Sequence, residues 1–372
     1  MNTQTEQFDI IIVYSGTKAK SASNKIYIDT PPFSQKSKMG VYNDSYKYFL
    51  ERCHKKGLKA AFATSTDICG TGMFKSFWTY DRTWQRHQHK AKTTILFDKF
   101  TPKNALQSAQ FALLTSSPNV YTFNNKNIKN IFDNKLHTYH TFKEFAIPTV
   151  EIKGVTEKEI LLAKKRLDTI LQTHPHAEDF SDQYIIKNKK GSGGFNIFQV
   201  TFTKNGIQKI LEHCEKNNKN ISYLLQPFLS CDTGFHFKKH SGTIDLRVIS
   251  LYKKTIQSYI RVAKKGNFLA NQHQGGNSFY ISLKKIPQDV LSMNRKVKNI
   301  LDATSDISHS LYALDYIRSN NGNLYLVEGN ANPGIYWEYD EIRSSKQKTK
   351  KLINVIVNEI QTIIHERKNT HS

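Results

Sequence analysis

Three oxygen-bearing side chains in the last third of the chain have the types and the spacing to hold a metal ion. They lie in Leu314–Gly334, which reads LDYIRSNNGNLYLVEGNANPG. Asn320–Asn323 is a turn signal between two apolar runs, so the stretch predicts a β-hairpin. Asp315 and Glu328 then lie side by side, and Asn330 points the same way. Two carboxylates and an amide oxygen suit Mg²⁺ held together with phosphate oxygens, although a solvated hairpin with scattered acids is the alternative.

A glycine-rich turn between two predicted strands has the composition of a phosphate-binding loop. It lies in Tyr184–Val200, which reads YIIKNKKGSGGFNIFQV. Glycine lacks a Cβ, so backbone N–H groups in such a turn can approach phosphate oxygens. Lys187, expected in a solvent-facing position at the end of the first strand, can reach the α- and β-phosphates. A Walker loop is excluded because no G-x-x-x-x-G-K-S/T is present, and a plain flexible hairpin remains the alternative. The loop residues are Gly191, Ser192, Gly193 and Gly194.

A third stretch, Ile244–Gly276, places charged residues on two further predicted strands. Asp245 and Arg247 lie on the first strand and Arg261 ends the second. Asn271 precedes a Gly-Gly pair. Taken alone, charged residues on paired strands are as compatible with solvated faces as with a site.

Taken in chain order, Tyr184–Val200, Ile244–Gly276 and Leu314–Gly334 resemble the ATP-grasp superfamily of carboxylate–amine ligases. The similarity is greatest to the branch of ribosomal-protein glutamate ligases and related amino-acid ligases. Three motifs carry the resemblance. In chain order they are Asp-x-Arg-Val, Gly-x-Phe-x-x-Asn-x-x-x-Gly-Gly, and Asp315 followed by Glu-x-Asn-x-x-Pro-Gly. Ala313 departs from the usual glycine, and Gln274 from a basic residue that lies near the second substrate in relatives. The second departure puts the donor's identity in doubt.

The resemblance implies a role for each candidate residue. Arg261 would stabilise the transferring phosphoryl group, Asn271 would orient an acyl phosphate, and Arg247 would hold a carboxylate substrate. Two Mg²⁺ ions, replaceable by Mn²⁺, would bind Asp315, Glu328 and Asn330. The phosphates of ATP would be held by Lys135, Lys187 and the glycine-rich loop. The adenine would lie against the hinge residues Gln226, Phe228 and Leu229, where Gln226 replaces a more usual acid. Asp232 would bind the ribose.

Composition bounds the class of protein. The chain has 372 residues, with 54 Lys and Arg against 31 Asp and Glu, a net charge of +23. Such an excess indicates an acidic partner or a bias toward solubility. Four cysteines without a C-x-x-C pair fit a reducing cytosol. The first residues are no signal peptide and no apolar run approaches 18 residues, so we expect a cytoplasmic protein without a membrane span.

The expected fold class is α/β (α+β), the ATP-grasp fold. An N-terminal open α/β domain is expected over residues 1–124, because its pattern of strand, helix and strand is typical of a parallel sheet. A small central subdomain over 125–220 and a C-terminal antiparallel-sheet subdomain over 221–372 with the metal site follow from the resemblance. Thr64–Lys92 mixes aromatic and basic residues, which predicts either an anion-binding surface or a surface hairpin.

The expected function is ATP-dependent formation of an amide bond through an acyl phosphate, with release of ADP and phosphate. The expected partners are an amino acid or other carboxylate and an amine on a peptide or protein. An anionic acceptor and a homo-oligomer are open alternatives. One alternative is a small-molecule ligase, similar to glutathione synthetase or of the D-Ala–D-Ala type. Another is a non-catalytic protein that binds ATP or nucleic acid.

Overall fold

The computed structural model describes residues 5–24, 31–102, 104–191, 194–216, 222–270, 274–336 and 342–369. Three of the expected site residues, Ser192, Gly193 and Asn271, lie outside these ranges. The chain forms two compact units. The first comprises residues 1–126, 308–311 and 332–372, and the second comprises 127–307 and 312–331. The division into three domains expected from the sequence remains a prediction.

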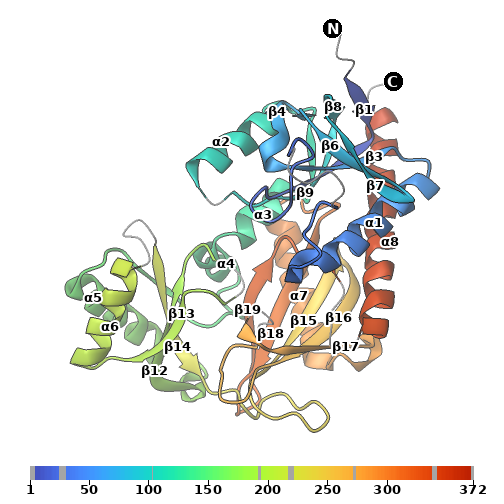
Figure 1. The fold of residues 1–372 in the computed structure, drawn as a ribbon. Coiled ribbons are helices and arrows are strands. Elements are labelled where there is room, and N and C mark those ends of the chain that lie inside the picture. Colours follow the sequence, from blue (N-terminus) through green and yellow to red (C-terminus); the bar gives the residue numbers. More distant parts are fainter. Residues whose placement is uncertain are drawn as a thin grey trace. The chain divides into compact units, whose positions relative to one another are not determined.

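The first unit is built on a parallel sheet with an antiparallel edge. The order of its strands is β10-β9-β2-β3-β6-β7, in which β10, β9, β2 and β3 run parallel (Figure 1). Strand β2 is buried along its whole length, which explains its unbroken apolar sequence. The strands and helices are β1 (Glu6–Phe8), β2 (Ile10–Tyr14), α1 (Val41–Lys55), β3 (Ala60–Thr64), β4 (Ile68–Gly70), β5 (Met73–Phe74), β6 (Phe77–Asp81), β7 (Thr83–His87), β8 (Ala91–Thr93), β9 (Ile95–Lys99), α2 (Ala105–Leu114), β10 (Tyr121–Phe123) and α8 (Ile342–Asn369).

The aromatic and basic stretch 64–92 contains the β6–β7 hairpin at the edge of this sheet. The Trp78 indole donates a hydrogen bond to the carbonyl of Lys20 at 3.0 Å. The rings of Tyr80 and Trp84 meet edge to face with centroids 5.5 Å apart. The first contact joins the hairpin to the rest of its unit, and the second lies within the hairpin itself.

The second unit contains two antiparallel sheets. The four-stranded sheet has the order β11-β14-β12-β13, and α5 and α6 cover one face of it (Figure 1). The five-stranded sheet has the order β17-β16-β15-β18-β19, with α7 packed on one face. The helices and strands are α3 (Lys126–Phe132), α4 (Lys135–Thr141), β11 (Val150–Ile152), α5 (Glu157–Gln172), β12 (Phe180–Asn188), β13 (Ile197–Thr201), α6 (Lys204–Lys216), β14 (Tyr223–Leu229), β15 (Ile244–Leu251), β16 (Lys254–Val262), β17 (Asn277–Ile281), α7 (Gln288–Thr304), β18 (Leu311–Arg318) and β19 (Leu324–Asn330).

Strict alternation along the five-stranded sheet separates a core face from a polar face. Leu246, Ile260 and Leu314 belong to the hydrophobic core beneath the sheet. The residues next to them in sequence therefore project from the opposite face. This polar face therefore carries the charged residues that the sequence singled out. On β19, Gly329 allows close packing against α3, because a Cβ at this position would lie 2.0 Å from the Phe132 ring.

Among the described residues, no helix combines the length and the apolar character that crossing a membrane requires.

Candidate functional site

The hairpin predicted from the sequence is confirmed as β18 and β19. Asp315 pairs in register with Glu328, and Ala313 pairs with Asn330. A bulge follows Asp315, which leaves Asp315, Glu328 and Asn330 on one face of the pair. The three oxygen-bearing side chains are thus neighbours.

Two arginines from neighbouring strands converge on Asp315. Arg247 donates from Nε and Nη2 to its two carboxylate oxygens at 2.6 and 2.5 Å, and Arg261 donates from Nη2 at 2.7 Å. The Asp315 side chain is 1% exposed. Burial alone would raise the pKa of Asp315, but Arg247 and Arg261 outweigh it and hold the pKa below the usual range. Charge-assisted pairs of this kind fix the planes of both guanidinium groups.

Asp245 completes the cluster and was not assigned a role from the sequence. It accepts two hydrogen bonds from Arg261, from Nε and Nη2, each at 2.7 Å. Tyr259, also unassigned, accepts from Nη1 of Arg247 at 3.3 Å. Within the described chain, Nη1 of Arg261 has no protein partner, so this N–H group is available to a ligand. The Asp-x-Arg spacing, which puts Asp245 and Arg247 on one face of β15, was the signal for Asp245.

Lys187 is a correction to the sequence analysis, because it does not face solvent. It lies within β12 between Ile197 of β13 and Leu224 of β14, and it is 6% exposed. Burial, with a smaller effect of the nearby Lys135, lowers the pKa of Lys187 to about 7. A desolvated ammonium group without a carboxylate in direct contact favours an anionic ligand.

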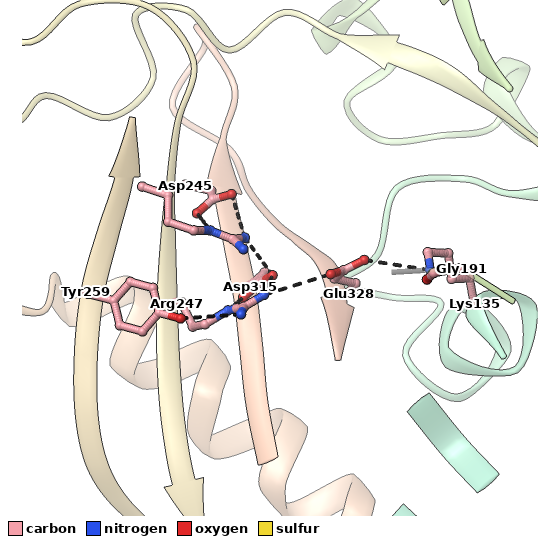
Figure 2. Close-up of polar contacts among 8 residues, drawn as sticks. Lys135, Gly191, Asp245, Arg247, Tyr259, Asp315 and Glu328 are labelled. Carbon is pink, nitrogen blue, oxygen red and sulfur yellow. Dashed lines mark hydrogen bonds and ion pairs between the residues drawn. The ribbon is translucent and has the colours of Figure 1, made fainter. Parts of the chain in front are cut away.

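Lys135, to which the resemblance assigns a role in holding ATP, begins α4. Asn134 caps the helix by accepting hydrogen bonds from the N–H groups of Leu136 and His137. The Lys135 ammonium donates to the carbonyl of Gly191, and it lies 3.9 Å from a carboxylate oxygen of Glu328. The same lysine therefore contacts Gly191 of the glycine-rich loop and Glu328 of the β18–β19 hairpin. Figure 2 shows this contact continuing through Glu328 to Arg247 and Asp315.

A pocket brings the two lysines together with the end of the hairpin. Gly191 accepts a hydrogen bond from Lys135, which lines this pocket, and Gly194 accepts a hydrogen bond from Gln274 at 3.3 Å and has a left-handed φ of 76°. Such backbone is easiest for glycine. The pocket is lined by Lys135, Thr138, Tyr139, Ala146, Ile147, Thr149, Lys187, Gln226, Leu326, Val327 and Glu328.

The expected adenine hinge is only partly represented in this pocket. The buried Gln226 lines it and donates to the Thr149 hydroxyl at 2.5 Å. Phe228 instead contacts Phe268, and Leu229 belongs to a core cluster. Asp232, expected at the ribose, accepts a hydrogen bond from Asn320 at 2.8 Å. Roles for Phe228, Leu229 and Asp232 in nucleotide binding remain predictions.

The residues on the hairpin fit a hard divalent cation. Glu328 is 26% exposed and pairs across the hairpin with Asp315, so the two carboxylates belong to one stretch of the polar face. In the described chain no group of three or more His, Cys, Asp or Glu residues forms a metal site. The predicted set therefore depends on the amide of Asn330 as well as on two carboxylates. Carboxylate and amide oxygens are the donors that Mg²⁺ and Mn²⁺ accept.

Comparison with known sequences gives this geometry a context. The family profile described as a RimK-like ATP-grasp domain matches residues 150–356. A probable alpha-L-glutamate ligase of Haemophilus influenzae (strain Rd) is 27% identical over 195 residues, which are 52% of this chain and 55% of that protein. The chain therefore spans about half the length of the curated relatives it matches.

Solved structures confirm the fold. The D-alanyl-alanine synthetase A of Vibrio cholerae superposes with a TM-score of 0.59 at 11% identity and covers 96% of this chain and 98% of its own. The D-alanine–D-alanine ligase of Bacillus anthracis, solved with ATP, gives a TM-score of 0.54 at 10% identity over 97% and 99% of the two chains. At these identities the likeness shows the fold alone, and it bears out the expected fold class.

Proposed function

Because the chain belongs to the RimK-like ATP-grasp family, we propose that it is an ATP-dependent ligase that joins a carboxylate to an amine. The reaction has two steps. A carboxylate oxygen attacks the γ-phosphorus of ATP, which breaks the bond to the bridging oxygen and releases ADP. The amine then attacks the acyl carbon of the acyl phosphate, phosphate leaves, and the amine nitrogen loses a proton. Both steps crowd negative charge, so positioning and electrostatic stabilisation dominate catalysis.

The observation that carries this proposal is the convergence of cationic groups around the β18–β19 hairpin. Arg247 and Arg261 are held by buried carboxylates, and Lys135 and Lys187 line the adjoining pocket. Lys187 and Lys135 would hold the α- and β-phosphates together with the glycine-rich loop, Gly191 to Gly194. Nη1 of Arg261 is the N–H group that would donate to the transferring phosphoryl group.

Arg247 would hold the carboxylate substrate, and the Asp315 pair fixes the orientation of its guanidinium group. Asn271 would orient the acyl phosphate. A Mg²⁺ ion bound by Asp315, Glu328 and Asn330 would neutralise charge on the phosphates. The chain's own contribution is to fix Arg247 and Arg261 before substrate arrives, which removes reorganisation from the chemical step.

The substrates are proposed from the names of relatives. An amino-acid donor, glutamate among the first to be tested, follows from the glutamate ligase relatives. The acceptor is proposed as an amine on a peptide or protein. The net charge of +23 favours an anionic acceptor. The fold of the D-alanyl-alanine synthetase keeps a small-molecule ligase as the second candidate.

The test is a screen of amino acids and peptides for stimulated release of ADP and phosphate, with mass spectrometry of the products. We expect one ADP and one phosphate for each amide formed. AMP as the stoichiometric product would overturn the acyl-phosphate mechanism. Binding of ATP without turnover on any amino acid or peptide would favour the non-catalytic alternative. The Glu328→Gln protein is the matched control for background hydrolysis of ATP.

A further inference from the structure

A buried carboxylate outside the site holds the turn of the β18–β19 hairpin. Asp179 is 1% exposed and accepts hydrogen bonds from the Asn321 amide at 2.8 Å, the Asn323 amide at 3.0 Å and the Tyr325 hydroxyl at 2.6 Å. Burial alone would raise the pKa of Asp179, but hydrogen bonds, the strongest from Tyr325, lower it. Asp179 therefore remains a carboxylate, which makes these hydrogen bonds charge-assisted and stronger than neutral ones.

The turn does not need Asp179 in order to close. Ser319 N–H donates to the Asn323 carbonyl at 2.8 Å, and Asn323 N–H donates to the Ser319 hydroxyl at 3.0 Å. Gly322 supplies the left-handed φ of 93° that the turn requires and donates to the Ser319 carbonyl at 3.0 Å. The hydrogen bonds to Asp179 therefore fix where the hairpin lies, rather than whether it forms.

Asp179 joins the hairpin to the sheet that carries Lys187. It directly precedes β12, and its carbonyl accepts from Ser230 N–H at 3.0 Å. Phe180, the first residue of β12, packs edge to face on Tyr325 with ring centroids 5.6 Å apart. Glu328 lies three residues after Tyr325 on β19, which is about 10 Å along the strand at about 3.3 Å per residue. Lys187 near the end of β12 and Glu328 line the same pocket.

We propose that Asp179 is a positioning residue, which sets Glu328 and Asp315 relative to Lys187 by fixing the hairpin turn to the start of β12. This inference rests on the proposed function, because it concerns how metal and nucleotide binding are coupled. Without the Asp179 carboxylate, the hairpin still forms and Asn320 N–H still donates to the Ser230 carbonyl at 2.8 Å, but fewer contacts hold its metal-binding end relative to the phosphate-binding lysine.

The experiment measures ATP binding by calorimetry as Mg²⁺ is varied, together with binding in EDTA and the melting temperature without ligand. The variants are Asp179→Asn and Tyr325→Phe; the second removes one hydrogen bond and leaves the carboxylate in place. Matched controls are Asp302→Asn and Tyr252→Phe, since Tyr252 donates to Asp302 at 2.9 Å in a second Tyr–Asp pair. These measurements need no knowledge of the donor or the acceptor.

We expect Asp179→Asn to raise the Mg²⁺ concentration for half-maximal ATP binding about tenfold, as for residues that orient metal ligands through other groups. Tyr325→Phe should raise it by less, the affinity for ATP in EDTA should stay within twofold of wild type, and both controls should match wild type. Unchanged Mg²⁺ dependence in both variants would overturn the proposal, even if both melted earlier. If Asp179→Asn does not fold, Tyr325→Phe decides alone. Failure of wild type to bind ATP with Mg²⁺ would instead overturn the proposed function.

Discussion

Replacing Lys187 by methionine should stabilise the ligand-free protein, with a gain that depends on pH. Lys187 is 6% exposed, and burial lowers its pKa from the ordinary 10.5 to about 7. Between these two pH values the unfolded chain holds a proton that the folded chain lacks. The free energy of unfolding of the wild type therefore rises there by about 1.4 kcal/mol per pH unit.

The difference between the pKa values of Lys187 in the unfolded and folded chains sets how much its burial destabilises the protein. Below about pH 7, both states carry the charge, and burying it costs stability up to a ceiling of about 5 kcal/mol. Methionine has nearly the same length and carries no charge. Lys187→Met should therefore unfold at a higher urea concentration than wild type near pH 6, with the difference shrinking as pH approaches about 10.

Urea unfolding followed by circular dichroism at several pH values measures this difference. Lys298→Met is the matched control, since burial lowers the pKa of Lys298 to about 8 and it lies away from the pocket. Lys298 also donates to the Lys253 carbonyl at 2.9 Å and to the Thr255 hydroxyl at 2.8 Å, so its replacement should give a smaller gain. Only Lys187→Met should abolish the rise in melting temperature caused by ATP with Mg²⁺. A Lys187→Met protein less stable than wild type near pH 6, or a difference independent of pH, would refute the reasoning.

Four further outcomes are expected. Glu328→Gln should fold normally but lose nearly all ADP formation, because a metal ligand contributes several kcal/mol to the transition state; a near-normal rate contradicts the site. Asp315→Asn should also lower the melting temperature, since breaking a buried ion pair costs about 3–5 kcal/mol; an unchanged melt contradicts the pairing with Arg247. ATP affinity, measured by calorimetry, should be greatest below about pH 7 and weaken as pH rises, because a bound phosphate raises the pKa of Lys187. Constant affinity from about pH 6 to 9 argues against a contact between Lys187 and the phosphates of ATP. The apparent affinity for the acceptor should fall as salt rises from about 50 to 200 mM, and a flat response would remove only the anionic acceptor.

The hairpin could be predicted from the sequence because its signals are local. Asn320–Asn323 specifies a turn, and a period of two residues then decides which side chains share a face. Once the turn is placed, Asp315 and Glu328 become neighbours without any knowledge of the remaining chain. The same period of two residues puts Asp245 and Arg247 on one face of β15 in the structure.

The burial and partners of these charged residues could not be predicted in this way. Lys187 lies in a sequence, KNKKGSGG, that is polar enough to indicate a solvent-facing loop. It is buried because β12 lies between β13 and β14, and the pairing of strands far apart in sequence has no local signal. Asp179 precedes its partners Asn321, Asn323 and Tyr325 by more than a hundred residues, so its role was equally invisible.

The balance of charge explains why the metal is expected to bind with the nucleotide and not before it. Three carboxylates, Asp245, Asp315 and Glu328, face two arginines and two lysines. With Lys187 only partly charged near pH 7, the cluster still carries no excess of negative charge for a lone Mg²⁺. The phosphates of ATP would bring that excess, while Arg247 and Arg261 stay bonded to Asp315. We therefore expect Mg²⁺ to bind tightly only together with ATP, because the added phosphate charge offsets the excess of cationic groups around Glu328 and Asp315.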